Sequence, residues 1–122
     1  MNNAENHQTS VTPVCAAERE VSAMAQMDPA AIIQKCNVVA TMLKALANPQ
    51  RLMIVCHLAQ GDKTVTELEQ LCLISQSSVS QHLTRMRLEG FIASRREGNF
   101  IYYRITDPKV LALIQTLHRL FC

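Results

Sequence analysis

Five cysteines carry the most reactive side chains of this 122-residue chain: Cys15, Cys36, Cys56, Cys72 and Cys122. A cysteine thiolate can be a nucleophile, a redox centre or a ligand for soft metal ions, whereas a buried thiol is often only a small packing group. The five cysteines form no Cys-x-x-Cys pair and no dense framework of the secreted, disulfide-rich type. They therefore fit a reducing compartment, in which each cysteine is either a packing side chain or a reactive thiol.

Cys56 and Cys122 lie in contrasting sequence contexts. Cys56 follows Leu52 by four residues within "RLMIVC", which places both on one face of a predicted helix and favours an inert packing role for the thiol. Cys122 ends the stretch "LHRLFC", just beyond an apolar helical stripe and close to His118 and Arg119. We expect the thiol of Cys122 to be exposed.

A second group of candidate residues lies on a predicted helix at 76–89. On a helical wheel Val79, Leu83 and Met86 share one side, and His82 beside them is expected to pack against the preceding turn. The opposite side is polar and free of carboxylates, so it suits a DNA major groove, where hydroxyl, amide and guanidinium groups can bind base edges or phosphate. The DNA-binding residues predicted for this helix are Ser77, Ser78, Ser80, Gln81, Thr84 and Arg85.

The distribution of charge also favours a nucleic-acid partner. The net charge is only +2, but from Gln76 to Arg104 five arginines face two glutamates, which gives +3 and leaves −1 for the rest of the chain. Arg95 and Arg96 lie near the tip of a predicted hairpin, from which they can reach the phosphates of double-stranded DNA. The alternative is that this helix face and hairpin tip are merely solvated.

The elements that position these residues follow from start and stop signals in the sequence. Asp28 with Pro29, and Asn48 with Pro49, are typical of helix starts, and they predict one helix from about residue 28 and another over about 49–59. Thr66 with Glu69 has capping-box spacing and predicts the start of a short helix. Further helices are predicted from a cap at Ser75 to Gly90 and from Asp107 and Pro108 onward; between them, 91–106 reads as a hairpin around Gly98 and Asn99.

Two short helices joined by a tight turn and followed by a hairpin predict a winged helix-turn-helix, mostly α with a β-hairpin wing. We expect residues 1–27 to form a flexible tail and residues 28–122 to form the DNA-binding and dimerisation domain. The sequence shows no secretory signal, membrane span, glycine-rich cofactor loop or paired carboxylate motif. It therefore predicts a cytoplasmic, homodimeric DNA-binding protein without a cofactor or a membrane partner, rather than an enzyme.

Three stretches carry a resemblance to a known family: "LKALANPQRLMIVCHL", "TVTELEQLCLISQSSVSQHLTRMRLEGFI" and "SRREGNFIYYRI". Together they resemble the ArsR-type winged-helix repressors from about residue 38 to the end. The resemblance implies a homodimer built on the first and last helices, and release of operator DNA when an inducer binds.

The metal sites common in this family are not matched by the sequence. At the positions of the thiolate ligands of the arsenic and cadmium branch stand Thr64 and Thr66, whose hydroxyls are poor ligands for soft cations. Of the zinc ligands on the last helix only Asp107 and His118 remain, and Lys109 stands where a histidine is needed.

Cys56 and Cys122 do match the dithiol of the persulfide-sensing and redox-sensing branch. The resemblance implies that sulfane sulfur, persulfide or another oxidant induces a disulfide or polysulfide bridge between them, which switches off operator binding. The competing hypothesis is a metal-responsive or arsenite-responsive repressor that uses Cys56, His118 and Cys122 as ligands.

Overall fold

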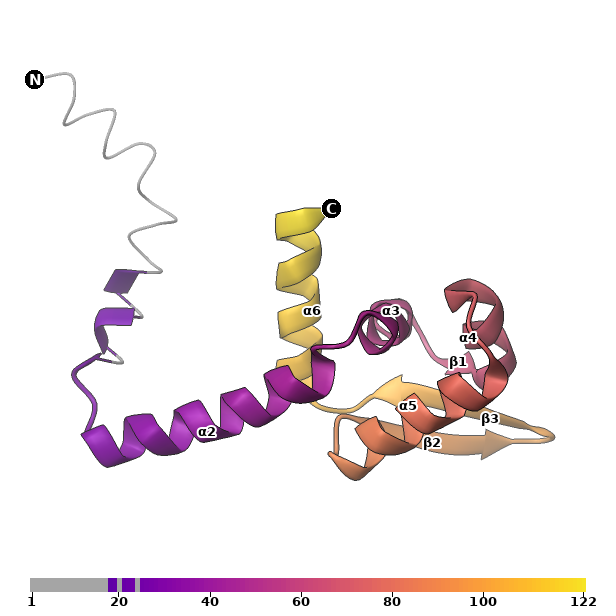
Figure 1. The fold of residues 1–122 in the computed structure, drawn as a ribbon, viewed down its shortest axis with the longest axis horizontal. Coiled ribbons are helices and arrows are strands. Elements are labelled where there is room, and N and C mark those ends of the chain that lie inside the picture. Colours follow the sequence, from indigo (N-terminus) through magenta and orange to yellow (C-terminus); the bar gives the residue numbers. More distant parts are fainter. Residues whose placement is uncertain (1–17, 20, 24) are drawn as a thin grey trace, which may run out of the picture. The chain divides into compact units, whose positions relative to one another are not determined.

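The computed structural model describes residues 18, 19, 21–23 and 25–122, which fall into two units that divide between Ala40 and Thr41 (Figure 1). The elements in chain order are α2 (Pro29–Leu46), α3 (Pro49–Leu58), β1 (Lys63–Thr64), α4 (Val65–Cys72), α5 (Gln76–Leu88), β2 (Ile92–Glu97), β3 (Phe100–Ile105) and α6 (Pro108–Phe121). The predicted tail at 1–27 falls mostly outside the described residues, and residues 18, 19, 21–23 and 25 are helical. The boundary between tail and domain stays a prediction.

Side-chain caps define three of the helix starts predicted from the sequence. Asn48 accepts hydrogen bonds from the backbone N–H groups of Gln50 and Arg51, at 2.9 and 3.1 Å, and so opens α3. Ser75 accepts from Ser78 N at 3.2 Å at the start of α5, and Asp107 accepts from Lys109 N at 2.8 Å at the start of α6. These bonds satisfy N–H groups that have no partner inside their own helix.

The start of α4 differs from the prediction. The capping box is formed by Thr64 and Glu67 rather than by Thr66 and Glu69, with bonds of 3.0 and 3.2 Å in the two directions. Thr64 is also the second residue of β1, a strand that the sequence did not predict and that pairs with Tyr102 and Tyr103 of β3. The strand pairing fixes the backbone at Thr64, so the helix begins two residues earlier.

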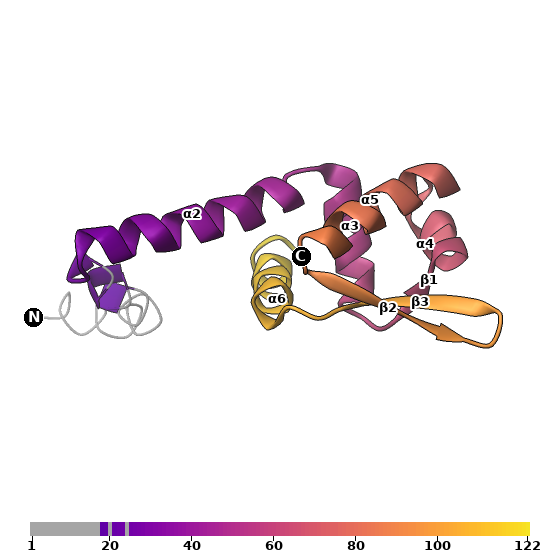
Figure 2. The ribbon, with the colours of Figure 1, turned by 90° about the horizontal axis from the view of Figure 1, so that it is seen from below.

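The hairpin forms as predicted, with β2 and β3 paired from Ile92 with Ile105 to Glu97 with Phe100, and Gly98 and Asn99 between them. Together with β1 they make a three-stranded antiparallel sheet in the order β1-β3-β2. Within the unit that begins at Thr41, helices α3, α4 and α5 pack beside this sheet, and the hairpin extends beyond them as the wing (Figures 1 and 2). The result is a winged helix-turn-helix.

One hydrophobic core joins these elements. It contains the end of α2, the inner faces of α3, α4, α5 and α6, and the start of β2, and its members are Ala45, Leu46, Ile54, Val55, Leu58, Leu68, Cys72, Val79, Leu83, Met86, Phe91, Ile92, Val110 and Ile114. Arg51 is also buried, and its Nε donates a hydrogen bond to the carbonyl oxygen of Ala45, which compensates for part of the cost of burying a charge. Burial, followed by the nearby charge of Arg85, lowers the pKa of Arg51.

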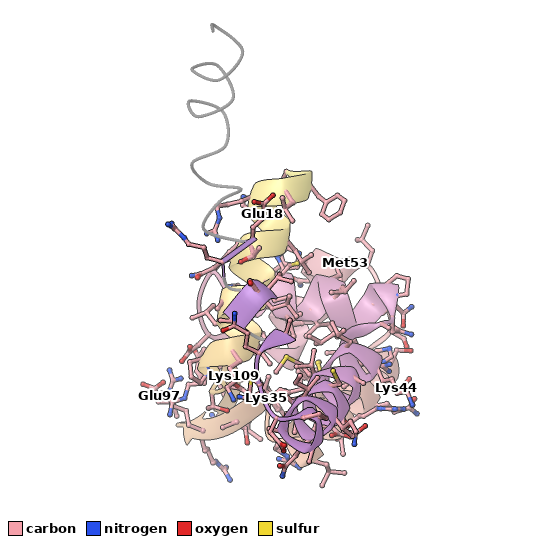
Figure 3. All side chains as sticks on the ribbon, turned by 90° about the vertical axis from the view of Figure 1, so that its left-hand side faces the viewer. Glu18, Lys35, Lys44, Met53, Glu97 and Lys109 are labelled. Atoms are coloured by element: carbon pink, nitrogen blue, oxygen red, sulfur yellow. The ribbon has the colours of Figure 1, made fainter. Side chains whose placement is uncertain are left out.

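In contrast to Arg51, Lys44 on α2 and Lys109 on α6 are exposed (Figure 3). Phe121, in the last turn of α6, is 82% exposed. Among the described residues, no single helix has the length and apolar character needed to cross a membrane; α2 and α3 pass such a test only as a pair, with a bend of 96° between them.

The turn between α4 and α5 contains Leu73 in the left-handed conformation, with φ of 56° and an 87% exposed side chain. A residue with a Cβ atom is strained there, whereas glycine is not. We predict that Leu73→Gly raises the free energy of unfolding by about 0.5 to 1 kcal/mol, because relief of strain exceeds the extra entropy of an unfolded glycine. Urea titrations at one fixed protein concentration would measure it.

Leu88 provides the matched control, since it is also a highly exposed leucine but ends the regular helix α5. Leu88→Gly is expected to lower the free energy of unfolding by up to about 1 kcal/mol through loss of helix propensity. Destabilisation by Leu73→Gly would show that the turn is not strained at this residue.

Candidate functional site

Helix α5 presents the polar face that the sequence predicted. Val79, Leu83 and Met86 are buried on its inner side. On its outer side Ser80, Gln81, Thr84 and Arg85 are exposed and, with Leu88, line a shallow hollow of about 490 Å³. Leu88, the last residue of α5, is 82% exposed.

The serines at the start of α5 are partly engaged with one another. The hydroxyl of Ser75 is 3.2 Å from that of Ser77 and donates to that of Ser78 at 3.0 Å. Ser77 is exposed, whereas Ser78 is half-buried. Ser77 is therefore more accessible to a DNA base or phosphate than Ser78.

The two wing arginines have different surroundings. Arg95 pairs with the carboxylates of Asp62 and Glu97, the latter at 2.9 Å, and its guanidinium carbon lies 4.9 Å from the centre of the Tyr102 ring. Its hydrogen bonds with Asp62 and Glu97 raise the pKa of Arg95. Arg96 donates from Nε to the carbonyl oxygen of Gly98 at 3.1 Å and, among the described residues, has no carboxylate partner. Arg96 is thus the wing arginine whose charge remains available to a phosphate.

His82 links α5 to α3. Its Nε2 lies 2.8 Å from Oε1 of Gln50 on α3, whereas the sequence predicted packing of this side chain against the turn before α5. Burial, then the charges of Arg51 and Arg85, lowers the pKa of His82. The imidazole is therefore neutral at neutral pH, so Nε2 carries a proton that it donates to the Gln50 oxygen.

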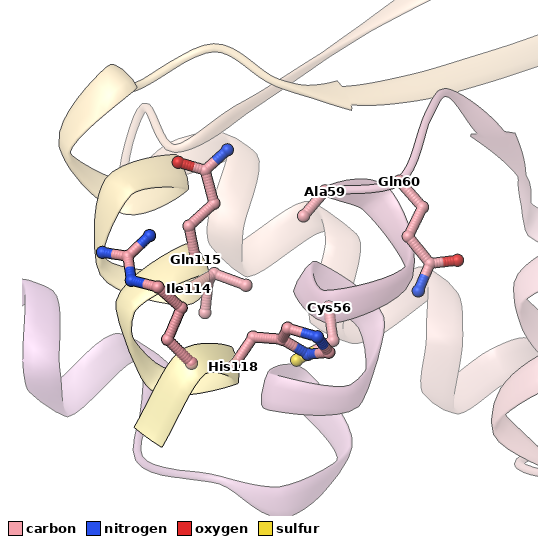
Figure 4. A pocket seen from close by; sticks show the side chains of 7 residues that line it. Cys56, Ala59, Gln60, Ile114, Gln115 and His118 are labelled. Carbon is pink, nitrogen blue, oxygen red and sulfur yellow. The ribbon is translucent and has the colours of Figure 1, made fainter. Parts of the chain in front are cut away.

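Cys56 is exposed, contrary to the packing role that the sequence favoured. It lines a pocket of about 510 Å³ between α3 and α6, whose other lining residues are Ala59, Gln60, Ile114, Gln115, His118 and Arg119 (Figure 4). The prediction that Cys56 shares the inner face of α3 with Leu52 was wrong, because Leu52 is itself only half-buried. The face of α3 that enters the core is set by Arg51, Ile54, Val55 and Leu58.

Cys122 follows the last turn of α6, and its backbone N–H donates to the carbonyl oxygen of His118 at 2.8 Å. Its thiol is exposed, as predicted. Partial burial, followed by the nearby Cys122 thiol, raises the pKa of Cys56. The chain thus brings these two thiols, which are far apart in sequence, into each other's electrostatic range.

The remaining cysteines have separate environments. Cys72 ends α4 inside the core, and its pKa is raised by burial and then by Cys56. Cys36 on α2 is exposed, and Cys15 lies outside the described residues. In the part of the chain that the structure describes, no group of three or more His, Cys, Asp or Glu side chains is placed to hold a metal ion. The ligand set Cys56, His118 and Cys122 therefore gains no support from the geometry.

Comparison with known proteins identifies the family. The profile described as "Bacterial regulatory protein, arsR family" matches residues 48–94. The biofilm growth-associated repressor of Xylella fastidiosa is 42% identical over 89 residues, which are 73% of this chain and 78% of that protein. The chain belongs to the ArsR family.

Two further comparisons place this ArsR-family chain in the branch that contains BigR and HlyU. The transcriptional activator HlyU of Vibrio cholerae is 41% identical over 81 residues, 66% of this chain and 75% of that protein. The crystal structure of the repressor BigR from Xylella fastidiosa has a TM-score of 0.72 at 40% identity, and covers 79% of this chain and 98% of its own. The protein is thus a winged-helix, DNA-binding transcriptional regulator and not an enzyme.

The contrast between the wing arginines predicts different contributions to DNA binding. We expect Arg96→Ala to reduce the slope of log affinity against log salt concentration by about one unit, the effect of losing one phosphate contact. Arg95→Ala should change the slope less, because two carboxylates already neutralise its guanidinium. Fluorescence anisotropy with a duplex selected from a random pool would measure both, with Lys109→Ala on α6 as control. Equal losses for the two variants would contradict the prediction.

The interaction between the two thiols predicts a measurable pKa change. Because a negative charge at Cys122 raises the pKa of Cys56, Cys122→Ser should lower that pKa and move the pH profile of Cys56 alkylation toward lower pH. Iodoacetamide labelling, followed by peptide mass spectrometry from neutral to alkaline pH, would measure the profile. Cys36→Ser is the control and should leave it unchanged. Superimposable profiles for the wild type and Cys122→Ser would show that the thiols do not interact.

Proposed function

We propose that the protein is a dimeric transcriptional repressor whose operator affinity is switched off when Cys56 and Cys122 become joined by a disulfide or polysulfide bridge. The inducer is a sulfane sulfur compound such as a persulfide, or another oxidant, and the regulator acts in the cytoplasm. The observation that carries the proposal is the approach of α3 and α6. Cys56 shares one pocket with the last turn of α6, and Cys122 follows that turn.

Three observations support this proposal. Both thiols are exposed, so a small oxidant can reach them. The solved structures related to this chain include one described as reduced HlyU from Vibrio cholerae, with a TM-score of 0.72 at 36% identity. The related structure from Xylella fastidiosa is described as the transcriptional repressor BigR, and repression is the sense of regulation proposed for this chain.

The chemistry is thiol exchange. The Cys56 thiolate attacks the outer sulfur of a persulfide R–S–S–H, so that a new S–S bond forms on Cys56 and R–S⁻ leaves and takes up a proton. The Cys122 thiolate then attacks Sγ of Cys56 and expels HS⁻, which leaves a disulfide. In total the two thiols lose two electrons and two protons, and the sulfane sulfur is reduced to hydrogen sulfide. A second persulfide that adds one more sulfur before closure gives a trisulfide.

The raised pKa of Cys56 sets the pH dependence of this reaction. A thiol with a raised pKa is mostly protonated at neutral pH, so the attacking thiolate is a small fraction of the total. The rate of bridge formation is therefore expected to rise with pH through the neutral range.

A bridge at Cys56 can influence DNA binding through α3. Gln50, near the start of the same helix, accepts the hydrogen bond from His82 of the DNA-reading helix α5. A bridge that pulls α3 toward α6 also acts on α5, because α3 and α5 share this hydrogen bond and the core residues between them. In a dimer that binds two half-sites, a small rotation of each reading helix changes the spacing that must match the DNA repeat.

Dimer formation is supported by apolar surface that each unit leaves open. The exposed large apolar side chains of α2 are Ile33, Val38, Val39 and Leu43. On α6 the exposed apolar side chains are Leu120 and Phe121. Apolar patches of this kind mark association surfaces in soluble proteins, and the resemblance assigns these same two helices to the dimer interface.

Persulfide treatment is expected to link Cys56 to Cys122 and to lower DNA affinity by about 5-fold to 150-fold, the usual range of an allosteric coupling. On the same sample, intact mass would detect the bridge, peptide mapping would locate it, and fluorescence anisotropy would measure the affinity for DNA. Cys56→Ser and Cys122→Ser should each retain DNA binding after treatment, and Cys36→Ser should respond like the wild type. Full release of DNA from both serine variants would refute the switch.

The metal-responsive alternative is tested by the same assay. Reduced protein is titrated with zinc, cadmium or arsenite, and DNA affinity is followed. Loss of DNA binding that requires His118 as well as the two cysteines would favour that alternative, and an unchanged affinity would favour the sulfur switch.

A further inference from the structure

The pocket beside Cys56 contains more polar groups than thiol exchange requires. From α6 it is lined by His118, Arg119 and Gln115, and from the end of α3 by Gln60 (Figure 4). In Figure 4 the ring of His118 reaches from α6 toward Cys56 across the pocket. Ile114 and Ala59 supply the apolar part of the lining. The sulfur of Cys56 therefore lies in a pocket whose lining includes hydrogen-bond donors.

Among the described residues, no carboxylate pairs with the charged group of this pocket. Arg119 donates one hydrogen bond, from its NH2 group to the hydroxyl of Thr116 at 3.1 Å. Within the described residues both ion pairs belong to Arg95, so Arg119 has no carboxylate partner there. The amide groups of Gln60 and Gln115 likewise have no hydrogen-bond partner in the described part of the chain. A guanidinium and two amides thus remain available to a bound molecule.

The size of the pocket favours an organic occupant. Its volume of about 510 Å³ lies in the range of sites that enclose small organic ligands, and far exceeds the roughly 30 Å³ that one water-sized molecule occupies. A peroxide or hydrosulfide would contact only a few of the lining groups. A guanidinium binds a carboxylate in preference to neutral groups, because it offers parallel N–H donors and an opposite charge.

We propose that this pocket is a recognition site for an organic persulfide that carries a carboxylate, with Arg119 binding the carboxylate while the outer sulfur of the persulfide lies at Cys56. The inference rests on the proposed thiol switch and adds the chemical class of its inducer. Arg119 is a specificity-determining residue in this site. The amides of Gln60 and Gln115 contact the polar body of the donor.

A matched pair of donors tests the site: N-acetylcysteine hydropersulfide, which is anionic, and its methylamide, which is neutral. The rate of bridge formation is measured by quenched-flow intact mass on the full chain. For the wild type the anionic donor is expected to react about fivefold faster than the neutral donor, which is the usual upper range for an exposed ion pair. The difference should shrink as salt is added.

Variants of Arg119 separate charge from structure. Arg119→Gln should bring the two rates together, and Arg119→Lys should restore part of the difference. Lys109→Gln removes an exposed cation from the same helix, outside the pocket, and should leave the ratio unchanged (Figure 3). Arg119 and Lys109 are both exposed, so circular dichroism and thermal unfolding should show a preserved fold in all three variants.

The outcomes for the site and for the switch are distinguishable. Equal rates for the two donors in the wild type, or an unchanged ratio in Arg119→Gln, would overturn the recognition site while the bridge still forms. If neither donor produces a bridge between Cys56 and Cys122, the switch itself fails and the recognition site fails with it.

Discussion

The packing of α3 against the core is the constraint on which the arrangement of both functional surfaces depends. Ile54 and Val55 are fully buried, and they place α3 against α4, α5 and β3. Because a helix buries one face only, the same packing turns Cys56 outward toward α6 and directs Gln50 toward His82. The ten-residue helix α3 thereby faces the thiol pocket with one side and α5 with another.

The buried Arg51 strengthens this constraint. A charged group in the core is destabilising unless its donors are satisfied, and the carbonyl oxygen of Ala45 at the end of α2 accepts from it. This bond joins the last residues of α2 to α3, and the Asn48 cap satisfies the first backbone N–H groups of α3.

Local signals explain why so much of the fold was predictable. Asn48, Ser75 and Asp107 cap helices through bonds to backbone groups two or three residues away, so their effect is visible in the sequence. The two-residue turn at Gly98 and Asn99 is equally local. The polar face of α5 was predictable because a helical wheel needs only the period of the helix. The family of the chain was then confirmed by comparison with its relatives.

The sequence predictions were wrong where contacts between residues far apart in the chain determine the local structure. Two overlapping Thr-x-x-Glu patterns compete at the start of α4, and the pairing of Thr64 with Tyr102, across the chain, selects the first. The orientation of Cys56 depends on which residues of α3 pack against β3 and α5. The four-residue spacing between Leu52 and Cys56 does not indicate those residues. The neutralisation of Arg95 by Asp62 joins residues 33 positions apart, so no local pattern could show it.

That ion pair also connects the wing to the loop after α3. Arg95 lies on β2, and Asp62 immediately precedes β1, so the pair fastens the outer strand of the hairpin to the segment that leaves α3. Dissolved ions weaken an exposed attachment of this kind. Rising ionic strength therefore has two opposite effects on the wing: it screens the attraction of Arg96 for the DNA backbone, and it releases the guanidinium of Arg95 from its own carboxylates.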